Sequence, residues 1–164
     1  MSPLDRTVAI LSDLIAYPTV SADSNLALIA HAAERLGDAG AAIHIHRDPT
    51  GEKANLFATI GPDRPGGVVL SGHTDVVPAL EPEWEGDPFA MRMDDGRLYG
   101  RGTCDMKGFI ACMLAMAQTF AARDLARPVH FALTYDEEVG CLGARQLVRD
   151  LAAAGIRPAA AIIG

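Results

Sequence analysis

Short apolar runs alternate with segments of helical apolar spacing along this chain, and this alternation most limits what the chain can fold into. Residues 68–70 are wholly apolar, and residues 129–134 and 159–163 are mostly so. Apolar runs of this length predict strands that are buried on both faces of a sheet. Because strands alternate with helices, the sequence predicts an α/β fold in which helices cover both faces of the sheet.

Further elements follow from capping residues and apolar spacing. A first helix is predicted to open at Ser2 and Pro3, since Ser is a favoured N-cap and Pro fits the first helical position, and to end before Pro18. Other helices are predicted over residues 24–38, 107–123 and 142–154, other strands over residues 42–46 and 55–60, and a hairpin over residues 91–99. The second helix is predicted to turn Leu26, Ile29, Ala30, Ala33 and Leu36 inward.

Composition narrows the possible classes of function. The chain has 164 residues, 49% hydrophobic and 21% charged, which suits one domain with an ordinary core. Its net charge of −7 argues against nucleic-acid binding, which needs clustered Lys and Arg. The first twenty residues lack the apolar core of a signal peptide, and no run of about 18 apolar residues occurs. We therefore expect a cytoplasmic protein without membrane contact.

The three cysteines agree with that expectation. Cys104, Cys112 and Cys141 form no C-x-x-C pair, and an odd number without pairs indicates reduced thiols. Cys112 is predicted to be a small buried side chain on a helix. Cys104 and Cys141 lie close in sequence to candidate site residues and are predicted to line that site.

The first candidate site motif directly follows the run at residues 68–70. In an extended segment, His73 and Asp75 point the same way. A metal-bound imidazole commonly donates its second N–H to a carboxylate, which fixes the tautomer and the direction of the ring. His73 as a metal ligand with Asp75 behind it fits that logic, whereas the alternative is a capped turn.

The second motif, residues 100–108, is rich in glycine and leads into a helix. Asp105 has two interpretations. It can cap the helix that begins near Lys107, or it can bridge two metal ions with its two oxygens. A phosphate-binding loop is a less supported interpretation because the segment lacks the G-x-x-x-x-G-K-[ST] pattern.

The third motif places Asp136, Glu137 and Glu138 at the end of the strand at residues 129–134. Three adjacent acids commonly form a solvated turn. A strand end inside a covered sheet is, however, a costly place for three carboxylates unless cations compensate. Adjacent glutamates can divide labour, since one can bind a metal and the other can take a proton from water. The three motifs together favour a metal-dependent hydrolytic site.

Other polar clusters are weaker candidates. His44 and His46 share one face of a strand and are expected to be an exposed polar face rather than an H-x-H metal site. His130 lies within a strand and is expected to be structural. A loop around Trp84 is expected to be solvated because of its acids, which are Glu81, Glu83, Glu85 and Asp87.

The order and spacing of the three motifs resemble one family. G-H-x-D, G-R-G-x-x-D-M-K-G and Asp-Glu-Glu followed by Gly resemble the aminoacylase and carboxypeptidase metallopeptidases. Within that family the chain is most similar to acetylornithine deacetylases. The segments that carry this similarity are SGHTDVVP at residues 71–78, LYGRGTCDMKG at 98–108, YDEEVGCLG at 135–143 and KANLFATIG at 53–61.

The resemblance implies a role for each site residue. His73 would bind one zinc ion, Asp105 would bridge both ions and Glu138 would bind the second. Glu137 would be the general acid/base, and Asp75 the carboxylate behind His73. The peptide bond from Asp105 to Met106 would be cis. Two zinc ions per complete site are implied, with cobalt as a possible substitute.

The implied reaction removes the acetyl group from N2-acetyl-L-ornithine, giving ornithine and acetate in arginine biosynthesis. Two alternatives stay open. One is another enzyme of the family, a succinyl-diaminopimelate desuccinylase or a metallo-dipeptidase. The other is a non-catalytic remnant that binds a metal or a partner.

The resemblance also implies that residues 1–164 are the amino-terminal portion of the zinc-dependent catalytic domain. In the family, the strand matching residues 160–164 is followed by a Glu-Pro whose Glu binds the first zinc. A lid and dimerisation domain and a last histidine ligand come later. The chain ends at Gly164, so it is expected to be inactive alone, while the full-length protein is expected to be a homodimer that acts on a small N-acylated amino acid.

Overall fold

The fold is described from a computed structural model that places residues 2–80, 82 and 84–164. Glu81 and Glu83 of the acidic loop lie outside the described residues. In the same loop Glu85 pairs with Arg92 at 3.4 Å, and Asp87 accepts a hydrogen bond from the Phe89 N–H. In the described part of the chain, no helix is long and apolar enough to cross a membrane.

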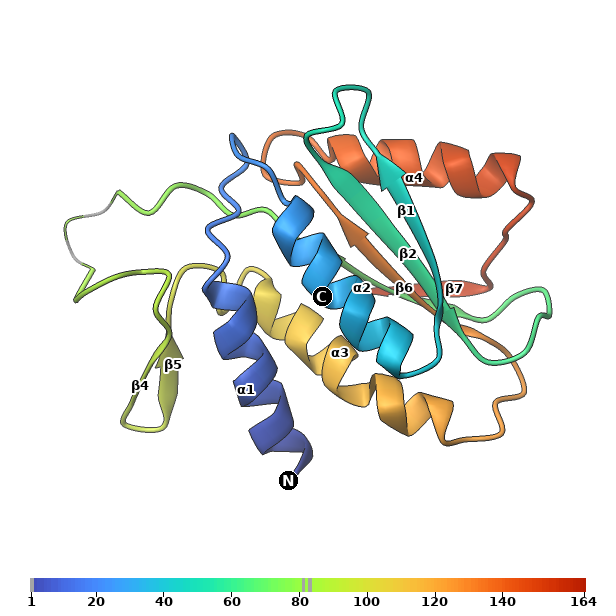
Figure 1. Cartoon of the computed structure of the whole chain (residues 1–164), viewed down its shortest axis with the longest axis horizontal. Coiled ribbons are helices and arrows are strands. Elements are labelled where there is room, and N and C mark those ends of the chain that lie inside the picture. The colour runs from blue at the N-terminus through green and yellow to red at the C-terminus, as the bar shows by residue number, and fades with distance from the viewer. Residues whose placement is uncertain (1, 81, 83) are drawn as a thin grey trace.

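A mixed five-stranded sheet forms the centre of the molecule (Figure 1), with the order β1-β2-β6-β3-β7. Its antiparallel half pairs β1 with β2 and β2 with β6, whereas β6, β3 and β7 are parallel. The strands are β1 (Ala42–Arg47), β2 (Ala54–Ile60), β3 (Val68–His73), β6 (Val129–Thr134) and β7 (Ala160–Ile163). The edge strand β7 is exposed along its whole length.

Helices cover both faces of this sheet, as the sequence predicts. Three helices lie on one face: α1 (Pro3–Ile15), α2 (Leu26–Asp38) and α3 (Lys107–Ala121), with α1 packed on α3. Their apolar faces form the main core with the sheet, around residues such as Leu14, Leu36 and Phe131. The fourth helix, α4 (Leu142–Ala153), covers the opposite face, where Leu147 packs against a smaller core that contains Phe57.

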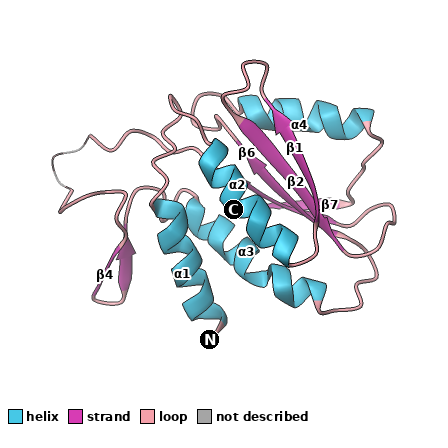
Figure 2. Ribbon diagram, in the orientation of Figure 1, coloured by secondary structure: helices cyan, strands magenta, loops and turns pink. Residues whose placement is uncertain are grey.

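A separate hairpin projects from the body of the molecule (Figure 2). It consists of β4 (Arg92–Asp94) and β5 (Arg97–Tyr99) in antiparallel pairing. The turn between them places Asp95 at φ 45° and Gly96 at φ 71°. Asp and Gly both tolerate this left-handed region, which two-residue hairpin turns require. The predicted hairpin is confirmed.

Several local predictions are confirmed and others are wrong. Ser2 and Asp5 form a capping box at α1. The predicted inward face of α2 is only partly right, because Ala30 is exposed and the buried stripe is Leu28, Ile29, Ala32 and Leu36. Cys112 is exposed rather than buried. Helix α3 is apolar nearly all round, so spacing does not select a single face there. Helix α2 is amphipathic, but the small side chain of alanine fits either of its faces.

Candidate metal centre

Two neighbouring parallel strands deliver the candidate site residues. His73 is the last residue of β3 and pairs in register with Thr134, the last residue of β6. The strand β3 therefore extends three residues beyond the predicted apolar run and carries His73 itself. The chain leaves β6 through Tyr135 into the acidic turn, defined here as Asp136–Glu138. Because β3 and β6 are parallel, their carboxyl ends meet at one edge of the sheet, where sites of this fold class form.

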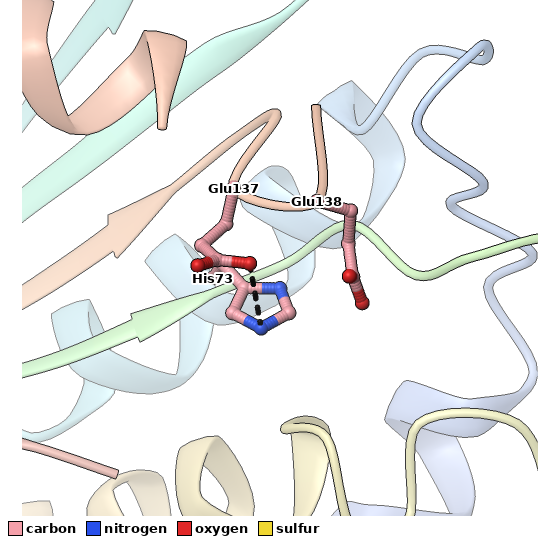
Figure 3. A group of neighbouring side chains, drawn as sticks. All are labelled: His73, Glu137 and Glu138. Atoms are coloured by element: carbon pink, nitrogen blue, oxygen red, sulfur yellow. Dashed lines mark ion pairs between the residues drawn. The ribbon is translucent and has the colours of Figure 1, made fainter. Parts of the chain in front are cut away.

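His73 and the two glutamates converge at that edge (Figure 3). Ligating atoms of His73, Glu137 and Glu138 all lie within 4.8 Å of one another. The Nε2 atom of His73 is 3.8 Å from Oε2 of Glu137. His73 is buried, Glu138 is half-buried and the side chain of Glu137 is 45% exposed. The acidic turn is thus not a simple solvated turn, because its carboxylates face a buried imidazole.

The Asp75 carboxylate holds the acidic turn through hydrogen bonds to its backbone. Its Oδ1 accepts the Glu137 N–H at 3.1 Å, and its Oδ2 accepts the Glu138 N–H at 3.3 Å. The Ser21 hydroxyl donates to the same Oδ2 at 2.7 Å. Burial alone would raise the pKa of Asp75, but hydrogen bonds from His73, Ser21 and the Glu137 amide outweigh it and lower the pKa to about 2. Asp75 is therefore a stable buried anion.

The ring of His73 is oriented by hydrogen bonds on both nitrogens. Nδ1 lies 2.9 Å from the carbonyl oxygen of Asp75 and 3.5 Å from its carboxylate. Nε2 lies 2.9 Å from Oδ1 of Asp105, so both ring nitrogens face oxygen acceptors, an arrangement that favours the doubly protonated ring. Burial would lower the pKa of His73, but hydrogen bonds to Asp75 and Asp105 raise it to about 9.

Asp105 reaches the site from the segment that precedes α3. Its side chain is 73% exposed and does not cap the helix, because Met106 is the N-cap and no side-chain capping bond is present. The capping alternative for Asp105 is therefore wrong. The peptide bond between Asp105 and Met106 is cis, as the resemblance implies. Burial and the charge of Asp105 together raise the pKa of Glu138.

The donor set fits a zinc ion. Zinc binds imidazole nitrogen and carboxylate oxygen, and a metal-bound His usually donates its other N–H to a carbonyl or carboxylate. His73 has this second partner in Asp75, and Asp105 lies 2.9 Å from its other ring nitrogen. The group whose ligating atoms all lie within 4.8 Å of one another is His73, Glu137 and Glu138. His73, Asp105 and Glu138 could hold the metal, with Glu137 left for proton transfer, which are the roles that the resemblance implies. This division of roles stays a prediction.

The Asp75 network supports a prediction about metal affinity. We expect Asp75→Asn to weaken zinc binding by about 10–100-fold, the usual effect of losing a partner of a metal-bound His. The amide removes the buried charge and can no longer accept hydrogen bonds on both of its side-chain atoms. Competition against a chromophoric chelator measures the change. An unchanged affinity would show that His73 does not bind the metal.

The structure also brings in residues that the sequence did not single out. Lys53 donates to Asp136, and Ser21 contacts Asp75. The Cys141 Sγ lies 3.7 Å from Oε1 of Glu137, so the prediction that this cysteine lines the site holds in the structure. Lys53 and Ser21 sit 83 and 54 positions from their partners, and no local pattern signals contacts over such separations.

The other histidine predictions can be compared with the structure. His130 contacts Thr59 and the Gly66 carbonyl, which agrees with a structural role. His44 is exposed, as expected of a polar face. His46 is half-buried, and its Nδ1 contacts Asp150 of α4 at 3.0 Å. In the part of the chain that the structure describes, neither His44 nor His46 joins a group that could hold a metal ion.

Comparisons with known proteins agree with this geometry. Over 98% of its length, the chain is 41% identical to the acetylornithine deacetylase of Proteus mirabilis, but it spans only 42% of that protein. Human carnosine dipeptidase 1 is similar in structure, with a TM-score of 0.82 and 26% identity over 98% of this chain and 38% of the dipeptidase. A metallo-carboxypeptidase of Sulfolobus solfataricus shares the fold at a TM-score of 0.83 and 19% identity, over 97% of this chain and 37% of that one.

A match to a model of a protein family covers the candidate site. The model of peptidase family M20/M25/M40 matches residues 69–164. That match begins inside β3, and it includes His73, Asp75, Asp105 and the acidic turn. It covers more than half of the chain and every candidate metal ligand. The chain therefore belongs to peptidase family M20/M25/M40.

Proposed function

We propose that this chain carries the amino-terminal portion of the catalytic domain of a zinc-dependent amidohydrolase that deacetylates N2-acetyl-L-ornithine. The observation that carries the proposal is the convergence of His73, Asp105, Glu137 and Glu138 at the carboxyl ends of β3 and β6. The choice of acetylornithine is supported by the 41% identity to the Proteus mirabilis deacetylase.

In this proposal each side chain has a distinct task. His73, Asp105 and Glu138 would hold the metal, and zinc there would polarise the amide carbonyl and acidify a water molecule. Glu137 takes a proton from the attacking water and passes it to the nitrogen of the leaving amine. Its side chain suits this exchange because it is 45% exposed, so it can meet a substrate, while its backbone N–H is held by Asp75.

A dipeptidase is the second candidate function. The structural similarity to human carnosine dipeptidase 1, at 26% identity, favours it. Both reactions hydrolyse an amide at the same kind of centre, so the residues described above do not separate them. Parallel assays of acetylornithine and carnosine would do so, in a form of the protein that turns over either one.

We expect the chain itself to bind zinc or cobalt but to hydrolyse neither substrate at an ordinary enzymatic rate. It offers three candidate ligands for two ions, whereas catalytic zinc usually keeps three protein ligands per ion. Calorimetric titration with each metal, followed by product assays, tests both parts. Failure of the chain to bind either ion would contradict the metal-centre assignment. Turnover of roughly 1–1000 per second would contradict the expected need for further ligands.

A further inference from the structure

Lys53 contacts the acidic turn through Asp136, and it has no role in the proposed chemistry. Its Nζ donates to Oδ1 of Asp136 at 2.5 Å and to the carbonyl oxygen of Ser21 at 2.5 Å. The side chains of Lys53 and Asp136 are only 16% and 10% exposed. An ion pair shielded from water in this way is costly to break, because removing one partner leaves a buried charge without compensation.

Asp136 is the residue through which this pair acts on the turn. Its backbone is in the left-handed region at φ 55°, and its carbonyl accepts the Leu142 N–H at the start of α4. The next two N–H groups, those of Glu137 and Glu138, are the ones that the Asp75 carboxylate accepts. The acidic turn is thus held at two points, by Lys53 through a side chain and by Asp75 through the backbone.

Ser21 joins these two anchors. Its carbonyl accepts from Lys53, while its hydroxyl donates to Asp75. Ser21 lies between α1 and α2, so one short segment supports both the ion pair and the carboxylate beneath the turn. The position of the two glutamates therefore depends on a connected set of polar contacts rather than on the turn alone.

We propose that Lys53 is a positioning residue that sets the placement of Glu137 and Glu138 by holding the Asp136 carboxylate. The proposal rests on the proposed function, because it assigns the two glutamates to metal binding and proton transfer. Without Lys53, the buried carboxylate of Asp136 loses its cation and turns toward water. The acidic turn then moves with it, and the N–H groups of Glu137 and Glu138 leave Asp75.

The change in zinc affinity distinguishes loss of the positioning role of Lys53 from loss of its positive charge. Removing a positive charge near a cation site weakens electrostatic repulsion and should by itself tighten metal binding. Loss of positioning acts in the opposite direction, because Glu138 moves away from His73. The sign of the change in Lys53→Met therefore separates the two effects.

The first experiment titrates zinc into the chain and its variants. We expect Lys53→Met to bind zinc about tenfold or more weakly, within the range usual for residues that orient metal ligands. Lys53→Arg should restore much of the affinity, since a guanidinium can also pair with Asp136. Arg47→Met is the matched control. Arg47 ends β1 and donates to the Gly51 carbonyl on the surface, so this variant should stay within about twofold of the parent.

A double variant tests the route through Asp136. If Lys53 acts on the site only by holding that carboxylate, the combined Lys53→Met, Asp136→Asn variant should bind zinc no more weakly than Asp136→Asn alone. A further loss in the double variant would overturn the route through Asp136. Unchanged or tighter binding by Lys53→Met alone would overturn the proposal itself.

Amide hydrogen exchange of the metal-free chain keeps the test independent of the proposed function. In Lys53→Met, exchange of the Glu137 and Glu138 amides should rise about tenfold or more, while amides of α1 and α3 keep the parent rates. If the parent chain binds no zinc but this exchange pattern appears, the proposed function fails and the positioning role stands. Equal exchange at Glu137 and Glu138 in the parent and Lys53→Met would exclude the role, and a rise throughout α1 and α3 would show general destabilisation instead.

Discussion

Replacing Glu137 with glutamine is expected to remove most turnover while leaving metal in place. Glutamine fills the same space but cannot accept a proton, and general acid–base catalysis is commonly worth about 10²–10⁴ in rate. The backbone N–H that Asp75 accepts is unaffected by the change. The expected result in the active form of the protein is therefore a loss of about 10²–10⁴-fold in kcat with the metal content of the parent.

The matched substitution at Glu138 should have a different kind of effect, which is loss of the metal. Glu138→Gln replaces a proposed zinc ligand with a neutral amide oxygen, which is a poorer partner for a dication. We expect metal content to fall, and activity to return in part when zinc is added in excess. Elemental analysis beside kinetics separates the two variants. If Glu137→Gln lost the metal and Glu138→Gln kept it, the roles of the two glutamates would be reversed.

Replacing Gly143 with alanine is expected to destabilise the fold beside the site. A Cβ at this position would lie 2.5 Å from Oδ1 of Asn55 and 2.6 Å from the carbonyl oxygen of Tyr135. Neither neighbour moves freely, since the Asn55 amide donates to the Gly143 carbonyl and the Tyr135 carbonyl accepts the Gly143 N–H. The start of α4 must therefore shift away from β2 and β6.

The expected cost of Gly143→Ala is about 3 kcal/mol in the free energy of unfolding, at the upper end for overpacked sites. For a chain of this size that corresponds to a fall in Tm of about 6–12 °C. Gly37→Ala is the control, because a Cβ there meets nothing within 4 Å and Gly37 lies in α2. Alanine is favoured over glycine in a helix, so the control should be neutral or stabilising by up to about 1 kcal/mol. Equal stability of the two variants would contradict this view of α4 packing.

Features that depend on local chemistry could be predicted from the sequence. The capping box at Ser2, the hairpin turn at Asp95 and the strand at residues 129–134 each follow from neighbouring residues. The meeting of His73 with Glu137 also follows, because neighbouring parallel strands end at one edge of the sheet. The position of these residues at the ends of predicted strands is therefore the main basis for predicting the site.

Features that depend on distant packing could not be predicted in this way. Nothing near Lys53 in the sequence indicates that it pairs with Asp136, since the pairing arises only when β2 lies beside β6. The buried face of α2 includes Leu28 and Ala32 rather than Ala30, because alanine is small enough to lie on either face of an amphipathic helix. Cys112 is exposed on α3 because that helix is apolar nearly all round, so its spacing does not select one buried face.

The parallel pairing of β3 with β6 has a consequence for the kinetics of folding. His73 and Asp105 are 32 positions apart, and Glu138 lies a further 33 positions along the chain, so no pair of proposed ligands is local. Closing these loops costs entropy before any ligand pair forms. A metal ion at the proposed site would bind only after the strands have paired, and it would stabilise the native state without stabilising the transition state. Zinc should therefore slow the unfolding of this domain and leave its folding rate almost unchanged.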